Sequence, residues 1–179
     1  MNRNTKFRKI QFGIAAGVLI LFAFWVFRSS TNQRAPVPAA WSPSSAQPKL
    51  PTVKLYLGYS ELVTEMVRRP AEIMTGMMFR TNMGPNEAML FVLPVPQQAS
   101  FYMRNTLIPL SCAYINDEGT ILEIHDMKPR DETLILSATL NIRFVLEVNR
   151  GWFETNHVGA GAVIGTDKGP LSSLLRAAN

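Results

Sequence analysis

The sequence predicts a mainly β fold, namely a compact antiparallel barrel or sandwich with two short helices, preceded by one transmembrane helix. Three observations lead to this class. After residue 51, about seven to nine short apolar or alternating segments follow one another, separated by turn-forming residues. No long helical spacing lies between these segments, so parallel strand–helix–strand units are not expected. One long apolar segment lies near the N-terminus.

Composition divides the 179 residues into five regions. We expect a basic cytoplasmic tail at 1–9, a transmembrane signal anchor at 10–27, a proline-rich linker at 28–51, a globular domain at 52–165 and a C-terminal tail at 166–179. All 13 acidic residues lie after residue 50, whereas seven of the 18 basic residues lie before it. The globular domain is therefore mildly acidic and lacks the excess of basic residues typical of nucleic-acid-binding domains.

Residues 10–27 contain Gln11 as their only strongly polar member. As a helix this segment would span about 27 Å at ~1.5 Å per residue, close to the thickness of a bilayer core. More basic residues precede it than follow it, so the positive-inside rule predicts a single pass through the cytoplasmic (inner) membrane. The N-terminus would lie inside and the globular domain in the periplasm or extracellular space, with the lipid bilayer as the partner of residues 10–27. A cleaved signal peptide is the alternative, but the apolar segment exceeds the usual ~7–15 residues and no small-residue cleavage site follows directly.

The linker contains Pro36, Pro38, Pro43, Pro48 and Pro51 without apolar periodicity. Such a segment is typical of a disordered or polyproline-like tether, which could reach on the order of 70 Å at ~3.1 Å per residue.

The first half of the domain begins with strands predicted at 53–57 and 62–67, joined by a Gly-Tyr-Ser turn. Pro70 suits the first position of a short helix at 71–77, because its missing N–H is not needed there. A continuous apolar run at 89–93 predicts a strand buried on both faces.

The second half continues with strands at 100–103, 111–115 and 120–124, of which the last two flank the hairpin turn Asn-Asp-Glu-Gly. Further strands are predicted at 133–136, 142–148 and 162–164. Asn149 is predicted to cap a short helix that ends near residue 156. Residues 171–178 are predicted to form a frayed terminal helix.

Polar residues interrupt the apolar segments and define a candidate pocket. Arg104-Asn105-Thr106 lies between two runs that should be buried, and buried polar groups need partners. The candidate binding residues are Arg80, Met103, Arg104, Asn105, Thr106, Glu147 and Asn149. In one interpretation the arginines bind an anionic small molecule or an envelope component through bidentate contacts. In the other, Glu147 pairs with Arg80 or Arg104 in an internal network, because an unpaired buried charge is costly.

No cofactor, metal site or catalytic residue is predicted. His125 and His157 have neither a cysteine cluster nor a Gly-x-Ser-x-Gly motif beside them. Cys112 is expected to be buried and inert. Thioethers suit Cu(I), but we expect the methionines to fill the core, notably Met74, Met77, Met78, Met83 and Met89.

Five blocks in order resemble the family called domain of unknown function 192. They are Gly76–Arg80, Met89–Val92, Phe101–Leu110, Asp117–Gly119 and Leu146–Gly151. The resemblance implies a β-rich barrel or sandwich with short helices, often with a signal peptide or anchor, and no established activity. Two positions depart from the family pattern. Ser111 stands where members usually have Asp, and Gly161-Ala162 where they usually have Gly-Asp, which weakens a role for those carboxylates.

The function favoured by the sequence is a membrane-anchored extracytoplasmic module that binds a small ligand or an envelope component through an Arg/Asn/Glu cluster, without catalysis. One alternative is a small-molecule enzyme, a hydrolase or lyase with an Arg/Glu pocket. The other is a tethered protein-interaction scaffold, whose protein partners the sequence does not identify.

Overall fold

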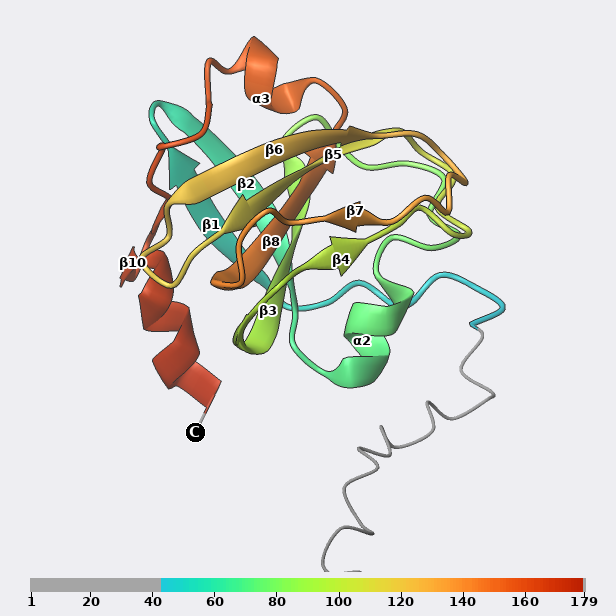
Figure 1. The fold of residues 1–179 in the computed structure, drawn as a ribbon, viewed down its shortest axis with the longest axis horizontal. Coiled ribbons are helices and arrows are strands. Elements are labelled where there is room, and N and C mark those ends of the chain that lie inside the picture. The colour runs from blue at the N-terminus through green and yellow to red at the C-terminus, as the bar shows by residue number, and fades with distance from the viewer. Residues whose placement is uncertain (1–42, 179) are drawn as a thin grey trace, which may run out of the picture. The chain divides into compact units, whose positions relative to one another are not determined.

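The computed structural model describes residues 43–178 (Figure 1). The predicted tail at 1–9, the anchor at 10–27 and the first part of the linker therefore lie outside the described residues. Within residues 43–178 no helix is both long enough and apolar enough to cross a membrane.

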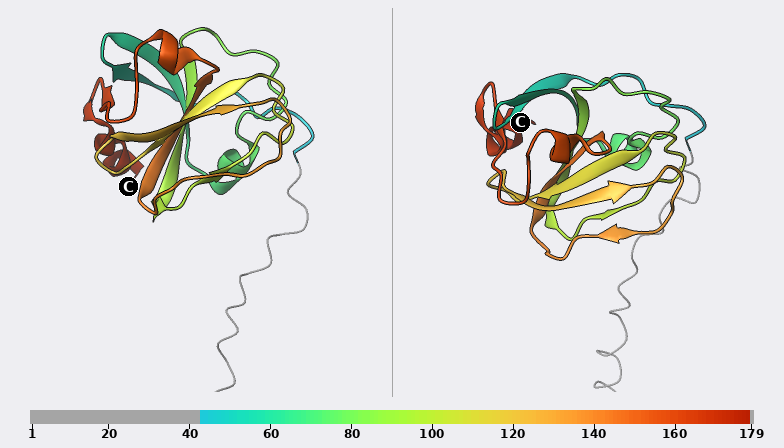
Figure 2. Two further views of the ribbon diagram at one scale, coloured as in Figure 1. Left: turned by 45° about the horizontal axis from the view of Figure 1, so that its top comes forward. Right: turned by 90° about the horizontal axis from the view of Figure 1, so that it is seen from above.

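An eight-stranded sheet with the order β10-β9-β1-β2-β3-β8-β5-β6 forms the domain. Its strands are β1 Thr52–Leu57, β2 Ser60–Val67, β3 Glu87–Gln97, β5 Leu110–Ile115, β6 Ile121–Met127, β8 Ile142–Asn149, β9 Gly165–Thr166 and β10 Gly169–Pro170. A second sheet pairs β4 Ser100–Phe101 with β7 Ile135–Leu136. The strands of the large sheet twist strongly, as the two views of Figure 2 show.

The mainly β class is confirmed, and the expectation of an antiparallel barrel or sandwich is corrected in two respects: the large sheet does not close into a barrel, and one of its strand pairs is parallel. β2 and β3 pair in parallel, while the other strand pairs of the large sheet are antiparallel. Helix α2 Pro70–Thr75 and the loop after it return the chain to the end of the sheet at which β2 begins. β3 can therefore run parallel to β2. The two outer parts of the sheet, near β6 and near β9, are joined among the described residues by one isolated bridge, Thr120 to Val163. No continuous ladder closes the sheet there.

Three short helices accompany the sheets: α2, α3 Trp152–Thr155 and the 3-10 helix η1 Leu171–Ala178. Asn149 does not cap α3 as predicted. It ends β8, where it pairs with Leu110, and Gly151 is the N-cap residue. The predicted strand at 162–164 is also displaced, because the chain pairs with β1 only at residues 165–166.

The large sheet separates two apolar cores. Side chains alternate along β3, so Leu90 joins one core and Phe91 the other, and the prediction of a strand buried on both faces is confirmed. Helix η1 covers the first core with Leu171 and Leu174. The second core contains Met89, Phe91 and Val145, and helix α2 packs against it through Ile73. We call this side of the sheet the α2 face.

Candidate functional site

The strand register places a row of side chains across the α2 face. Glu65 of β2 pairs with Met89 of β3, Met89 pairs with Glu147 of β8, and Glu147 pairs with Cys112 of β5. Directly paired residues project from the same face of a sheet. Two glutamates therefore lie on one apolar surface, with a single strand between them.

Glu65 is fully partnered. Its carboxylate accepts hydrogen bonds from Nη1 and Nη2 of Arg80 at 2.5 and 2.8 Å, and from the Leu50 amide at 2.8 Å. Both members of the ion pair are buried. Burial alone would raise the pKa of Glu65, but the hydrogen bonds from Arg80 and Leu50 outweigh it and lower the pKa below its ordinary value. This pair is a structural ion pair.

The turn after α2 brings Arg80 to Glu65. Gly76 has a φ of +47°, and a Cβ atom there would lie 3.2 Å from Cζ of Phe91, so the turn sits directly on the sheet. Phe79 also has a positive φ, and its amide donates to the Asn105 carbonyl at 2.8 Å. The Gly-Met-Met-Phe-Arg sequence therefore encodes a tight turn that ends in a buried guanidinium.

Glu147 has no such partner. It is only 5% exposed, and its Oε2 atom is buried without a hydrogen-bond partner among the described residues. None of the ion pairs formed within residues 43–178 includes it. Burial in this apolar setting raises the pKa of Glu147 to about 8. Two glutamates on the same face thus have opposite pKa shifts, because Arg80, the Leu50 amide and Lys49 all donate to Glu65.

The side chain of Glu147 borders a cavity of about 200 Å³ between α2 and the sheet. The cavity, which we call the α2 pocket, is lined by residues 73–78, Phe91, β4 with Tyr102, Thr106 and Glu147. Three methionines and three aromatic residues make up half of its lining. Among the described residues, Glu147 is the only acidic member of this lining, and no Lys, Arg or His belongs to it. A mainly apolar pocket with a few polar groups is the usual form of a small-molecule site.

A larger cavity of about 330 Å³ lies between β1, β2 and η1. Two of its three cations are already engaged, since Lys54 pairs with Glu61 at 2.6 Å and Arg68 donates to the Leu174 carbonyl at 2.6 Å. The α2 pocket is the better candidate site, because it contains a buried ionisable group that the protein leaves unpaired.

The structure brings only part of the predicted cluster together. Glu147 and Thr106 line the α2 pocket, and Met103 is buried in the core beneath it. Arg104 is exposed, donates to Glu132 at 2.8 and 2.9 Å, and lies 5.3 Å from the centre of the Tyr102 ring. The predicted pairing of Glu147 with Arg80 or Arg104 is therefore wrong.

The two asparagines have structural contacts. Asn105 adopts a positive φ of 55°, where its carbonyl receives the Phe79 amide. Asn149 donates to the Gly84 carbonyl at 2.8 Å and holds the loop before β3. Neither side chain lines the α2 pocket.

Sequence reasoning missed Glu65 and the aromatic wall of the pocket. Glu65 shares one face of β2 with Val63 and Val67, because the three residues are two positions apart. This spacing could have identified a carboxylate facing inward. Phe91 and Tyr102 could not be identified in this way, because the candidate pocket was predicted from charged, amide and hydroxyl side chains that interrupt apolar runs, and these two aromatic residues lie within such runs.

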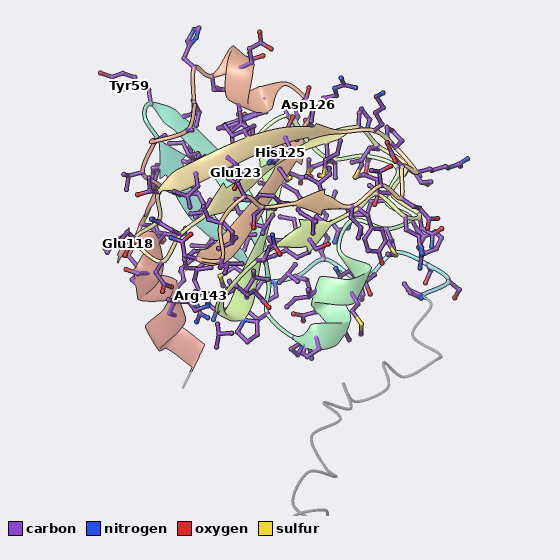
Figure 3. All side chains as sticks on the ribbon, viewed as in Figure 1. Tyr59, Glu118, Glu123, His125, Asp126 and Arg143 are labelled. Carbon is purple, nitrogen blue, oxygen red and sulfur yellow. The ribbon has the colours of Figure 1, made fainter. Side chains whose placement is uncertain are left out.

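His125 continues the same row on β6 beyond Cys112, but neither His125 nor Ser111 lines the α2 pocket. His125 pairs with Glu123 at 3.1 Å, and Figure 3 shows both on β6, apart from α2. Ser111 donates to Asp126 at 2.6 Å and accepts the Gly151 amide at 3.1 Å. Within the described residues, no three His, Cys, Asp or Glu side chains are placed to hold a metal ion.

Comparisons with known proteins agree with the fold. The DUF192 family model, described as "Uncharacterized ACR", matches residues 56–166. A crystal structure from Sinorhizobium meliloti 1021, named a "putative transcription regulator", is 29% identical with a TM-score of 0.60, covering 64% of this chain and 92% of that one. A protein of unknown function from Novosphingobium aromaticivorans DSM 12444 is 31% identical with a TM-score of 0.58, covering 76% of this chain and 97% of the other. No curated protein matched the chain.

Removing the buried arginine should destabilise the domain strongly. In Arg80→Met, Glu65 loses its buried counter-ion, and we expect a loss of about 3–5 kcal/mol in the free energy of unfolding. Urea titration of wild type and Arg80→Met measures this loss in the free energy of unfolding. The double variant Glu65→Leu/Arg80→Met should recover much of this loss, because no uncompensated charge remains.

The matched control is Arg104→Met, which removes an exposed pair and should cost at most about 1 kcal/mol. Equal losses in Arg80→Met and Arg104→Met would contradict the assignment of Arg80–Glu65 as the buried structural pair.

Glu147 should make the domain less stable as the pH rises from about 4.5 to about 8. Below its ordinary pKa of 4.5 the carboxyl is protonated in both the folded and the unfolded chain. Above that value only the unfolded chain ionises, so the free energy of unfolding falls by up to about 1.4 kcal/mol per pH unit. The decline should level off above about pH 8, where the folded carboxyl ionises too.

Unfolding midpoints of wild type and Glu147→Gln, measured at intervals from pH 4 to 9, test this slope. Glu147→Gln should lack the decline, whereas the exposed control Glu154→Gln should keep it. Parallel pH profiles for wild type and Glu147→Gln would show that burial does not perturb Glu147.

Proposed function

The chain belongs to the DUF192 family, and we propose that its β domain is a binding module that takes a small ligand in the α2 pocket at Glu147. We further propose that residues 10–27 anchor the module in the cytoplasmic membrane and that the linker after them, whose last part contacts the domain through Gln47, Lys49 and Leu50, holds it outside.

One observation carries the binding proposal: a carboxyl group more than nine-tenths buried faces a cavity, and its Oε2 atom has no partner within residues 43–178. Leaving such a group unpaired lowers stability, and an apolar side chain of similar size would avoid this penalty. Groups of this kind gather at functional sites, where a ligand supplies the missing contact. Glu65 serves as an internal reference, because the same surface satisfies its carboxylate completely.

The size of the pocket limits the ligand. Drug-sized ligands occupy pockets of roughly 300–1,000 Å³, whereas an apolar cavity of roughly 150 Å³ holds benzene. At about 200 Å³ the α2 pocket fits a ring or short chain with one polar group. Nucleotides and polymers are too large for it.

Anchoring is supported by the sequence. The apolar segment, the basic residues before it and the proline-rich linker after it form the arrangement of a signal anchor with a tether. A pocket tethered in this way would sample small molecules or envelope components close to the membrane.

Catalysis by Glu147 is a second candidate function. A carboxyl whose pKa is raised to about 8 is protonated at neutral pH and can act as a general acid, as a small-molecule hydrolase or lyase would require. The predicted Arg/Glu pocket is not present, because no arginine lines the cavity. Glu147→Gln separates the two functions, since an enzyme would lose turnover and keep its substrate.

Occupancy of the α2 pocket can be measured by NMR on the full chain in lipid nanodiscs, with methionine methyl groups labelled. Met77 and Met78 line the pocket, and Met127 on β6, which lines neither of the two cavities described, is the internal reference. Three probes of one size but different charge, benzylammonium, benzyl alcohol and benzoate, are titrated at pH 8. We expect at least one probe to shift Met77 and Met78 selectively.

A variant that obstructs the pocket should abolish these shifts. Ser100 lines the cavity and is exposed, so Ser100→Trp can cover it while Ser100→Ala serves as the matched control. Binding by wild type and Ser100→Ala, but not by Ser100→Trp, supports the proposal. If none of the three probes reaches Met77 or Met78, the domain is not a small-ligand module.

The location of the domain is tested in bacterial cells by protease treatment. In intact spheroplasts the wild-type domain should be accessible to added protease while the chain stays in the membrane fraction through carbonate extraction. Leu19→Asp/Leu21→Asp should abolish both properties, because charges within the apolar segment prevent insertion. Leu19→Ala/Leu21→Ala is the control. A protease-protected wild-type domain would place it on the cytoplasmic side.

A further inference from the structure

We propose that the ligand of the α2 pocket is a small organic cation, a compact apolar group carrying an ammonium or a related nitrogen cation, with Glu147 as its counter-ion. This inference rests on the proposed function and specifies the ligand class.

The charges around the pocket favour a cation. Among residues 43–178, Glu147 is the only acidic member of the wall, and no Lys, Arg or His of that range lines it. The buried guanidinium of Arg80 is held by Glu65, which lies two strands away from Glu147. An anion would meet a carboxyl group and no positive partner, which removes the reason for the anionic ligand suggested by the sequence.

The wall suits a nitrogen cation with an apolar body. Phe91, Phe101 and Tyr102 contribute aromatic rings, whose faces attract cations within about 6 Å. Met77 and Met78 contribute polarisable thioethers that adapt to the shape of a ligand. Tyr102 already holds one cation, since Arg104 lies 5.3 Å from its ring centre.

The backbone adds to the same preference. The pocket is lined by the C-terminal end of α2 and the turn that follows, residues 73–78. Carbonyl groups at a helix C-terminus carry partial negative charge, which favours cations. Here the Glu72 and Gly76 carbonyls already accept from Gln47 Nε2, and the Thr75 carbonyl accepts from the Met78 amide, so only part of this charge faces a ligand. Because α2 has only six residues, its contribution is modest and secondary to that of Glu147.

Other titratable groups near Glu147 supply no competing positive charge. Cys112 on β5 has a pKa raised by burial and by Glu147, so its thiol stays neutral. Tyr114 on β5 donates its hydroxyl to the Ile135 carbonyl at 2.5 Å. Further along the face, His125 is paired with Glu123, and across Tyr102, Arg104 is paired with Glu132.

A cation would bind the ionised form of Glu147. Since burial raises the pKa of the empty site to about 8, binding at pH 7 must release close to one proton. Affinity should rise about tenfold per pH unit below pH 7 and level off above pH 8. A neutral ligand that accepts a hydrogen bond from the protonated carboxyl would show the opposite trend.

The test uses the matched probes benzylammonium, benzyl alcohol and benzoate with the full chain in nanodiscs at pH 6, 7, 8 and 8.5. Methionine methyl NMR gives the affinities, and calorimetry in buffers of different ionisation enthalpy gives the protons released. Benzylammonium should bind most tightly at pH 8, show the predicted pH profile and release a proton. Glu147→Gln should weaken it at least tenfold, whereas Glu154→Gln should leave it unchanged.

Two other results separate the inference from the function on which it rests. If benzyl alcohol or benzoate binds as tightly as benzylammonium at pH 8, or Glu147→Gln retains full affinity for benzylammonium, the cation assignment is wrong but the pocket still binds small ligands. If no probe shifts Met77 or Met78, the inference and the binding function both fail.

Discussion

The Arg80–Glu65 ion pair is the interaction on which the α2 face depends. It attaches the turn after α2 to β2, and that turn forms much of the wall of the α2 pocket. The turn places Gly76 against Phe91 and Phe79 at a positive φ, and the ion pair at its end helps to hold this conformation together with the bond from the Phe79 amide to the Asn105 carbonyl. The same pair engages the buried arginine of this face, and among the described residues Glu147 has no counter-ion.

Glu65 and Glu147 together show what a counter-ion does on this surface. Both are about 95% buried, and both belong to one row of the sheet, with Met89 between them. Desolvation is the largest influence on each pKa, yet one pKa falls and the other rises. Desolvation alone therefore does not determine the ionisation of a carboxyl group here. The donors that reach it decide the direction, and at Glu147 the available space for a donor is the pocket itself.

Much of this arrangement could be read from the sequence, and the limits have a physical cause. Local alternation located most of the strands, and polar residues inside apolar runs identified Glu147 and Thr106. The partner of Arg80 could not be identified, because register between β2, β3 and β8 depends on the whole sheet and not on any one segment. The parallel β2–β3 pairing could not be predicted either. The connection between these strands, residues 68–86, contains a helix of only six residues, shorter than the helix of the usual crossover. The aromatic wall combines β3, β4 and the following loop, which are brought together only by the fold.

The departure at Ser111 also has a different meaning once the faces of the sheet are known. Ser111 alternates with Leu110 and Cys112 and therefore points away from the α2 face. Its hydroxyl bridges the Gly151 amide and Asp126, the residue directly opposite on β6. A carboxylate thus remains at this point of the sheet, supplied by the neighbouring strand and paired with Arg150 at 3.2 Å. Because this network lies across the sheet from Glu147, replacing an acid by Ser111 leaves the single carboxyl group of the α2 pocket unaffected.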